Sequence, residues 1–332
     1  MTQAAPLAEI WRGPFLESTH HGHAVICDDT GAVVAAWGDP QAVVLPRSSA
    51  KMIQALPLVE SGAADAARLW TEHLALACAS HQGADIHTRR VRAWLDHIGM
   101  DDGDFRCGAQ EPADRAARDA LIRGHARPCQ VHNNCSGKHA GFLTLARHLG
   151  AGPDYIDPGH PVQRAVRAAF EDVTGAESPG FGIDGCSAPN FATTLHGMAR
   201  AMAFFAAARA DDTAPRTSAA ARLRDAMTAF PELVAGEGRA CTELMRACSE
   251  PVALKTGAEA FFVAMIPGRK LGVALKVADG GTRGAECAIT ALLVRLGVLD
   301  PDHPATRKRM NAPIRNWRGI ETGTIRPAEG LG

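Results

Sequence analysis

The order of strand-like and helix-like segments is the feature that most restricts the fold of this chain. Residues 18–45 have the composition and turns of extended strands. From there to about residue 249, apolar residues repeat mainly at helical spacing, and frequent alanine favours helix. Strand-like segments return at residues 258–266 and 271–277, and a last helix is predicted over residues 284–296. Strands from both ends of the chain therefore enclose a long helical insert.

This order predicts an α/β protein of the α+β kind, with one antiparallel sheet formed by N- and C-terminal strands. We expect a discontinuous sheet domain, residues 1–47 and 250–332, and a mainly helical domain over residues 48–249, with the active site at their junction. The tail over residues 303–332 is too irregular to assign. Helices of the insert are predicted over residues 65–78, 85–98, 112–123, 138–149, 160–174, 191–209, 216–229 and 238–248.

Composition excludes several classes of partner. The 332 residues include 35 Lys and Arg against 36 Asp and Glu, so we expect no general electrostatic attraction to nucleic acid or to an anionic membrane. The first residues lack the pattern of a secretion signal, and no apolar run reaches transmembrane length. The nine cysteines are irregularly spaced without C-x-x-C, which fits reduced thiols and predicts a cytoplasmic protein.

The segment L-P-R-S-S-A-K at residues 45–51 carries the first chemical signal. Its serine, Ser48, stands where we predict the start of a helix that ends near Gly62. Lys51 follows at helical spacing, so the two side chains would share a face of the first turn. A lysine amine so placed can take the proton of a serine hydroxyl. A helix-capping serine beside a solvated lysine is the structural alternative.

A second triplet, K-T-G, opens a C-terminal strand at Lys255. An S-x-x-K helix start and a K-T-G strand are paired in penicillin-recognising serine hydrolases. A second ammonium near Lys51 would favour the neutral form of that lysine, and only a neutral amine acts as a base. Ser80 lies in a small-residue turn, where we expect it to be exposed enough to relay protons, although no S-D-N triplet occurs. A helix C-terminal cap is its structural alternative.

Cysteines in two loops raise the question of a metal. Cys135 and Lys138 fall in the first turn of a predicted helix, where the helix N-terminus lowers the pKa of a thiol. Cys186 lies in a comparable loop before a helix. Two thiolates could hold zinc with one further ligand, but without a C-x-x-C pattern buried structural thiols are the simpler interpretation.

At these positions the chain resembles the rhizobial-type L-asparaginases over nearly its whole length. The shared motifs are L-P-R-S-S-A-K at residues 45–51, A-C-A-S-H at 77–81, C-G at 107–108, N-N-C-S-G-K-H at 133–139, G-I-D-G-C at 182–186 and K-T-G-A-E at 255–259. The resemblance implies a fold similar to serine β-lactamases, hydrolysis of L-asparagine to L-aspartate and ammonia, and a homodimer.

The resemblance also implies roles for particular residues. It implies two Ser–Lys pairs, Ser48 with Lys51 and Ser80 with Lys255. It further implies one zinc per chain, substrate-orienting or structural, held by the side chains of Cys135, Cys186 and Lys138.

Three further residues are candidates for binding the substrate. Arg47 has the planar donor fork that suits an α-carboxylate, although an ordinary surface ion pair explains it as well. Asp184 would hold the substrate ammonium, support a zinc ligand, or only stabilise a turn. His139 would line the pocket.

Two alternatives remain open from the sequence. The same Ser–Lys apparatus would serve a glutaminase or a hydrolase of β-lactams or other amides. A zinc- or thiol-dependent sensor that binds an amino acid on this scaffold is the non-enzymatic alternative.

Overall fold

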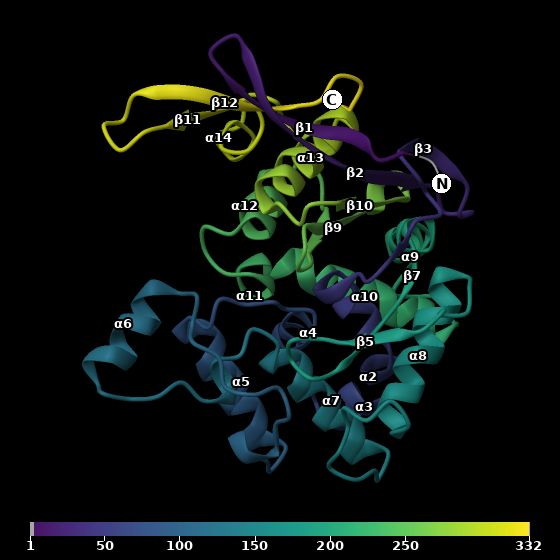
Figure 1. Ribbon diagram of the computed structural model, residues 1–332. Coiled ribbons are helices and arrows are strands. Elements are labelled where there is room, and N and C mark those ends of the chain that lie inside the picture. Colours follow the sequence, from purple (N-terminus) through teal and green to yellow (C-terminus); the bar gives the residue numbers. More distant parts are fainter. Residues whose placement is uncertain (1–2, 332) are drawn as a thin grey trace. The chain divides into compact units, whose positions relative to one another are not determined.

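The structure is a computed structural model that describes residues 3–331, and its chain divides into two compact units (Figure 1). The first, which we call the sheet unit, comprises the N-terminal segment through Ser49, Thr193–Ala207 and the C-terminal segment from Glu243. The second, the helical unit, comprises Ala50–Ala192 and Ala208–Thr242.

The sheet unit is built on an antiparallel sheet in the order β11-β12-β1-β2-β10-β9-β8, with β3 also paired to β2. Its central pairing joins the two ends of the chain, because β2 lies antiparallel to β10 with Val25 opposite Ala274. The predicted sheet of N- and C-terminal strands is thereby confirmed. The strands are β1 (Ala5–Arg12), β2 (Phe15–Cys27), β3 (Val33–Trp37), β8 (Ala253–Thr256), β9 (Phe261–Ile266), β10 (Leu271–Val277), β11 (Ala312–Arg315) and β12 (Glu321–Pro327).

Helices cover both faces of this sheet. Gly272 of β10 lies so close to α9 (Leu195–Ala207) that a Cβ there would meet the backbone of Ala203. Successive strand residues point to opposite faces, and on the other face α13 (Thr282–Arg295) brings Gly284 against His20 of β2 (Figure 1). Helix α9 falls within the range expected for the helical insert but packs on the sheet.

The helical unit contains most of the insert. Its longer helices agree with the predicted periodicity, whereas two predicted helices are broken into shorter pieces. The helices are α1 (Lys51–Gln54), α2 (Leu56–Glu60), α3 (Ala63–Ala66), α4 (Thr71–Ala77), α5 (Asp85–His97), α6 (Arg115–Arg123), α7 (Ser136–His148), α8 (Pro161–Thr174), α10 (Pro215–Ala229) and α11 (Pro231–Val234), with α12 (Ala240–Ala247) at the passage into the sheet unit.

The helix expected from Ser48 to Gly62 is not continuous. A 3₁₀ turn over Arg47–Ala50 comes first, and the chain then forms α1 and α2 with a break at Ala55. Pro57 explains the break, because its nitrogen carries no hydrogen to donate to the preceding turn. The helix predicted over residues 65–78 likewise divides into α3 and α4.

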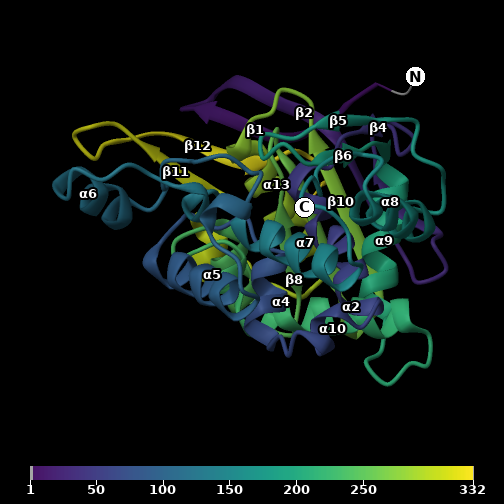
Figure 2. The ribbon, with the colours of Figure 1, turned by 90° about the horizontal axis from the view of Figure 1, so that it is seen from below.

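Helices α4 and α7 pack side by side in the helical unit (Figure 2). Gly137, in the first turn of α7, makes the close approach possible, because a Cβ there would collide with the carbonyl oxygen of Leu76 in α4. A Cβ at Gly141, one turn further along, would meet side chains alone, the nearest being Leu58 at 3.3 Å. The first turn of α7 is thus held close to the end of α4.

We expect Gly137→Ala to destabilise the protein by about 1–3 kcal/mol, because the helices must separate to admit the methyl group. The matched control is Gly141→Ala, where a flexible side chain gives way and alanine adds about 1 kcal/mol of helix propensity. Urea unfolding followed by circular dichroism measures both changes. Equal effects of the two substitutions would contradict this account of the packing.

Candidate active site

The segment that carries Ser48 is fastened to the first C-terminal strand within the sheet unit. Ser49, the next residue, is buried and its Oγ donates a hydrogen bond to the carbonyl oxygen of Lys255 at 3.1 Å. At Gly257 a Cβ would lie 2.6 Å from the carbonyl oxygen of Pro46 and 2.9 Å from Ser49 Oγ. The glycine of K-T-G therefore permits the approach, and the structure brings the Ser48 and Lys255 motifs together.

The backbone is strained at this place. Arg47 has φ of 52°, in the left-handed region that residues other than glycine rarely adopt. Glu259, just after the K-T-G triplet, has φ of 57°. A short pairing of β4 (Val43–Val44) with β7 (Thr193–Thr194) holds the extended approach to Arg47 in register. Ser48 itself is half-buried.

The two lysines of the predicted pairs are both buried. Lys255 Nζ donates to the carbonyl oxygen of Thr256 at 2.8 Å in the sheet unit. Lys51 Nζ, in the helical unit, donates to the carbonyl oxygens of Ala79 and of Asn134, the latter at 3.4 Å. Lys51 therefore connects the turn before Ser80 to the loop before Cys135.

Ser80 corrects one expectation, since it is buried with only 9% of its surface exposed. Its amide donates to the carbonyl oxygen of Val234 at 2.9 Å, and this hydrogen bond holds the turn against the end of α11. The predicted pairs, Ser48 with Lys51 and Ser80 with Lys255, each draw one member from each unit, and both pairings stay predictions.

The three residues predicted to hold zinc converge within the helical unit. Cys135 and Lys138 flank the start of α7, and Cys186 lies in the turn between β5 (Phe181–Ile183) and β6 (Pro189–Phe191). Lys138 Nζ donates to Cys186 Sγ at 3.0 Å, and the Cys135 thiol, whose hydrogen Asn134 Oδ1 also accepts at 2.9 Å, donates to Cys186. All three side chains are buried. The β5–β6 hairpin replaces the simple loop that the sequence suggested around Cys186.

The protonation of this cluster follows from its hydrogen bonds. A hydrogen bond from Cys135, followed by the Lys138 charge and His139, lowers the pKa of Cys186 well below its usual range despite burial. The same hydrogen bond and burial raise the pKa of Cys135. Burial lowers the pKa of Lys138, but the negative charge of Cys186 outweighs burial, with smaller contributions from Cys135 and Asp184, and that pKa is raised. Cys186 is thus a thiolate beside a thiol and an ammonium.

This donor set fits a thiophilic metal ion such as zinc. Two sulfurs and one amine nitrogen already meet, and binding requires only that Cys135 and Lys138 release their protons. Among the residues that the structure describes, no group of three or more His, Cys, Asp and Glu side chains is placed to hold a metal ion. A site here therefore depends on the lysine as a ligand.

His139 lies at this cluster, although sequence reasoning placed it only in a pocket wall. Its ring is buried, and Nδ1 shares a hydrogen bond of 2.8 Å with the hydroxyl of Tyr155. Its Nε2 makes no hydrogen bond of normal geometry, yet lies close enough to affect the pKa of Cys186. Tyr155 was missed because nothing in the local sequence pattern relates it to the His139 helix. Asp184 is half-buried and acts electrostatically on Lys138.

A buried histidine, His81, joins the Ser80 turn to the Cys135 loop. Its Nδ1 accepts from the amide of Gly83, so its Nε2 carries the hydrogen and donates to Ser136 Oγ at 2.9 Å. Ser136 Oγ in turn donates to the carbonyl oxygen of Val131. Burial lowers the pKa of His81 well below its usual value. The neutral ring stacks on His87, with centroids 4.8 Å apart.

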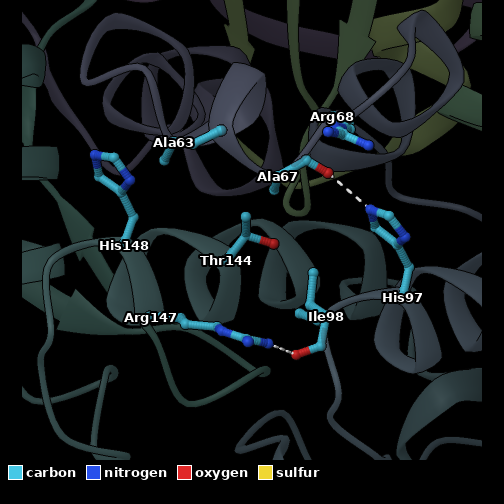
Figure 3. Close-up of a pocket in the computed structure, with 9 residues that line it drawn as sticks. Ala63, Ala67, Arg68, His97, Ile98, Thr144, Arg147 and His148 are labelled. Carbon is cyan, nitrogen blue, oxygen red and sulfur yellow. Dashed lines mark hydrogen bonds between the residues drawn. The ribbon is translucent and has the colours of Figure 1, made fainter.

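Two cavities have charged side chains in their walls. One of about 480 Å³ in the sheet unit is lined by Arg47, Glu259, Lys276 and His23. Another of about 510 Å³ in the helical unit is lined by several basic side chains, and Figure 3 shows His97 and Arg147 donating to backbone carbonyls there. The second contains none of the predicted site residues, whereas the first contains Arg47, next to Ser48.

The family model described as L-asparaginase II matches residues 8–327. The chain belongs to this L-asparaginase II family. The resemblance to asparaginases is thereby confirmed. A search of curated proteins finds no match. No helix among residues 3–331 is both long and apolar enough to span a membrane.

This L-asparaginase II family member is similar in structure to several solved proteins at low sequence identity. Mglu in its native form is 14% identical, with a TM-score of 0.47, and the match covers 85% of this chain and 66% of that chain. This chain therefore spans just under two thirds of the length of Mglu. A beta-lactamase from Mycobacterium bovis is 14% identical, with a TM-score of 0.43 and coverage of 84% and 95%. A beta-lactamase from Burkholderia vietnamiensis is 15% identical, with a TM-score of 0.36 and coverage of 79% and 86%.

The buried His87 predicts a pH-dependent stability. Burial lowers the pKa of His87 in the folded protein. Below about pH 6.5, the pKa of an unperturbed histidine, the unfolded chain therefore binds more protons than the folded one. The free energy of unfolding accordingly decreases as the pH is lowered. We expect His87→Gln to reduce this loss by up to about 1.4 kcal/mol per pH unit. Urea unfolding at about pH 7.5 and pH 5.5 measures it. Exposed His148 supplies the control His148→Gln, and equal slopes for both variants would contradict the assignment.

Proposed function

We propose that this protein hydrolyses the side-chain amide of L-asparagine to L-aspartate and ammonia through a serine acyl-enzyme. The fastening of the Ser48 segment to the Lys255 strand, through Ser49 and Gly257, carries the proposal. It supports a Ser–Lys hydrolase, because the segment that carries Ser48 contacts the K-T-G segment, and S-x-x-K and K-T-G are paired in such hydrolases. Membership of the L-asparaginase II family supports the substrate.

In the proposed reaction Ser48 attacks the amide carbon while Lys51 accepts the hydroxyl proton. Ser80, with Lys255, delivers a proton to the departing ammonia. Water then hydrolyses the aspartyl ester and regenerates Ser48. The amide N–H of Ser48 is the natural donor to the oxyanion. Lys51 and Lys255 are both buried, so the proposed proton transfers would take place away from bulk water.

A cavity beside Ser48 supports recognition of an amino acid. Arg47 and Lys276 supply positive charge to its lining, and Glu259 supplies negative charge. A substrate with both an α-carboxylate and an α-ammonium matches such a lining. We therefore assign Arg47 to the carboxylate. Asp184 and His139, which lie with the thiol cluster of the helical unit, are proposed to complete substrate binding.

Ser48→Ala is expected to lower kcat for asparagine at least about 1,000-fold, because the nucleophile is removed. Ser61→Ala, on an exposed serine whose hydroxyl donates to the carbonyl oxygen of Pro57, is the control and should leave kcat unchanged. Ammonia release is the measurement, with the acylated serine located by mass spectrometry. Full activity of Ser48→Ala, or acylation of another serine, would overturn the mechanism.

The same assay separates the alternative functions. Glutamine and a chromogenic β-lactam are compared with asparagine at equal enzyme concentration. Hydrolysis of either without hydrolysis of asparagine would assign a glutaminase or a β-lactam hydrolase. Binding of an amino acid without turnover, unaffected by Ser48→Ala, would assign a sensor.

We also propose that Cys135, Cys186 and Lys138 hold one zinc ion. Loss of the lysine proton costs about 4.6 kcal/mol at pH 7 from the reference pKa, and more where that pKa is raised. Structural zinc sites supply about 10–16 kcal/mol, which is enough. When bound, the ion would supply positive charge that orients the substrate or shapes the pocket. His139 would keep the Cys186 sulfur in place.

Replacing any of the three donors is expected to abolish stoichiometric zinc. Cys135→Ser, Cys186→Ser and Lys138→Met are each compared with Cys107→Ser, a buried thiol whose Sγ lies 3.6 Å from the carbonyl oxygen of Gln130. Metal analysis of the purified proteins is the measurement. The control should keep about one zinc per chain, as one ligand set predicts. Undiminished zinc in a donor variant removes that residue from the site.

We further propose a cytoplasmic homodimer, following the asparaginase resemblance. The nine cysteines are all free thiols in the structure. Free thiols are what a reducing compartment maintains.

A further inference from the structure

Tyr155 is the only tyrosine of the chain, and its side chain is completely buried in the helical unit. Its position is fixed from two sides. Gln163 of α8 donates to the backbone carbonyl oxygen of Tyr155 at 2.8 Å, and the backbone amide of Arg106 donates to the hydroxyl oxygen at 2.8 Å. The ring packs edge-on against that of His139, with centroids 5.4 Å apart. The phenol is therefore held in one orientation beside the thiol cluster.

The direction of the hydrogen bonds follows from the number of hydrogens available. The hydroxyl of Tyr155 has one hydrogen to donate, while its oxygen already accepts from the amide of Arg106. Among residues 3–331 the remaining partner of this buried hydroxyl is Nδ1 of His139, at 2.8 Å. If Nδ1 donated instead, the hydroxyl hydrogen would be buried without an acceptor, which is costly. Tyr155 therefore donates to Nδ1, and the imidazole carries its own hydrogen on Nε2.

The hydrogen on Nε2 of His139 is directed to the sulfur of Cys186. Nε2 is buried and makes no hydrogen bond of normal geometry, and Cys186 is the side chain with which His139 interacts there. Lys138 Nζ donates to the same sulfur at 3.0 Å. A sulfur that faces several donors is held in place by them. The hydrogen bonds thus run in one direction, from the Arg106 amide through Tyr155 and His139 to Cys186.

We propose that Tyr155 is the positioning residue that makes His139 a fixed donor to the sulfur of Cys186. The hydrogen bond from Tyr155 sets both the orientation of the imidazole and the nitrogen that carries its hydrogen. Partners of this kind orient metal ligands from outside the coordination shell, and their loss typically lowers metal affinity 10–100-fold. The effect on zinc rests on the proposed site of Cys135, Cys186 and Lys138, whereas the arrangement of Tyr155 and His139 does not.

Nitrogen NMR of the full-length, zinc-free protein, labelled in its histidine rings, tests the arrangement. The His139 signals are identified by their absence in His139→Gln. We expect the hydrogen on Nε2, and Tyr155→Phe should shift the Nδ1 signal, because the ring stays while its hydrogen bond is lost. Thr290→Val removes a buried hydroxyl that donates to the carbonyl oxygen of Glu286, and as the control it should leave both signals unchanged. A hydrogen on Nδ1, or an Nδ1 signal that Tyr155→Phe does not shift, would overturn the proposal.

Zinc affinity, measured by competition with a chromogenic chelator, tests the consequence. Tyr155→Phe is expected to weaken zinc binding about tenfold, and Thr290→Val should not. In a His139→Leu background Tyr155→Phe should have no further effect, because Tyr155 acts through His139. An unchanged affinity of Tyr155→Phe, or an equal loss in both backgrounds, would overturn the positioning role. Absence of zinc from the unsubstituted protein would overturn the proposed metal site instead, and the NMR result then decides the role of Tyr155.

Discussion

The antiparallel pairing of β2 with β10 is the interaction on which the rest of the structure depends. It joins a strand from the first residues of the chain to one from the last third, and places Val25 opposite Ala274 in the buried centre of the sheet. Each hydrogen bond of the ladder adds only about 1 kcal/mol net. Full burial of a large apolar side chain adds about 1.5–3 kcal/mol. The apolar side chains that α9 and α13 cover therefore decide the pairing.

This pairing also explains why two short motifs far apart in sequence meet. Ser48 follows the N-terminal strands, and Lys255 lies near the end of β8, two strands from β10. With the sheet closed, the remaining requirement is space, which Gly257 supplies by having no Cβ at the carbonyl of Pro46. Any larger residue would separate the two motifs. The glycine thus has a packing reason that the sequence pattern alone does not reveal.

Sequence periodicity predicts those elements whose burial is regular along the chain. Strands β9 and β10 and the longer helices were predicted because nearly every position, or one clear face, is apolar. The hairpin of β11 and β12 was missed because few of its residues are buried and because it includes Pro313 and Pro327. In the site, polar contacts between segments, such as His139 with Tyr155 or His81 with Ser136, have no local signature. The convergence of Cys135, Lys138 and Cys186 was expected only through the family resemblance.

The buried thiol cluster shows how opposing electrostatic terms settle a protonation state. Burial alone would lower the pKa of Lys138 and raise the pKa of both thiols, because it disfavours the charged form of each group. The hydrogen bond from Cys135 makes Cys186 the anion instead, and that anion then keeps Lys138 charged. The charges are mutually dependent, so removal of one leaves the other buried and uncompensated. A divalent cation that displaces both protons would remove this dependence, because its own charge replaces that of the ammonium beside the two sulfurs.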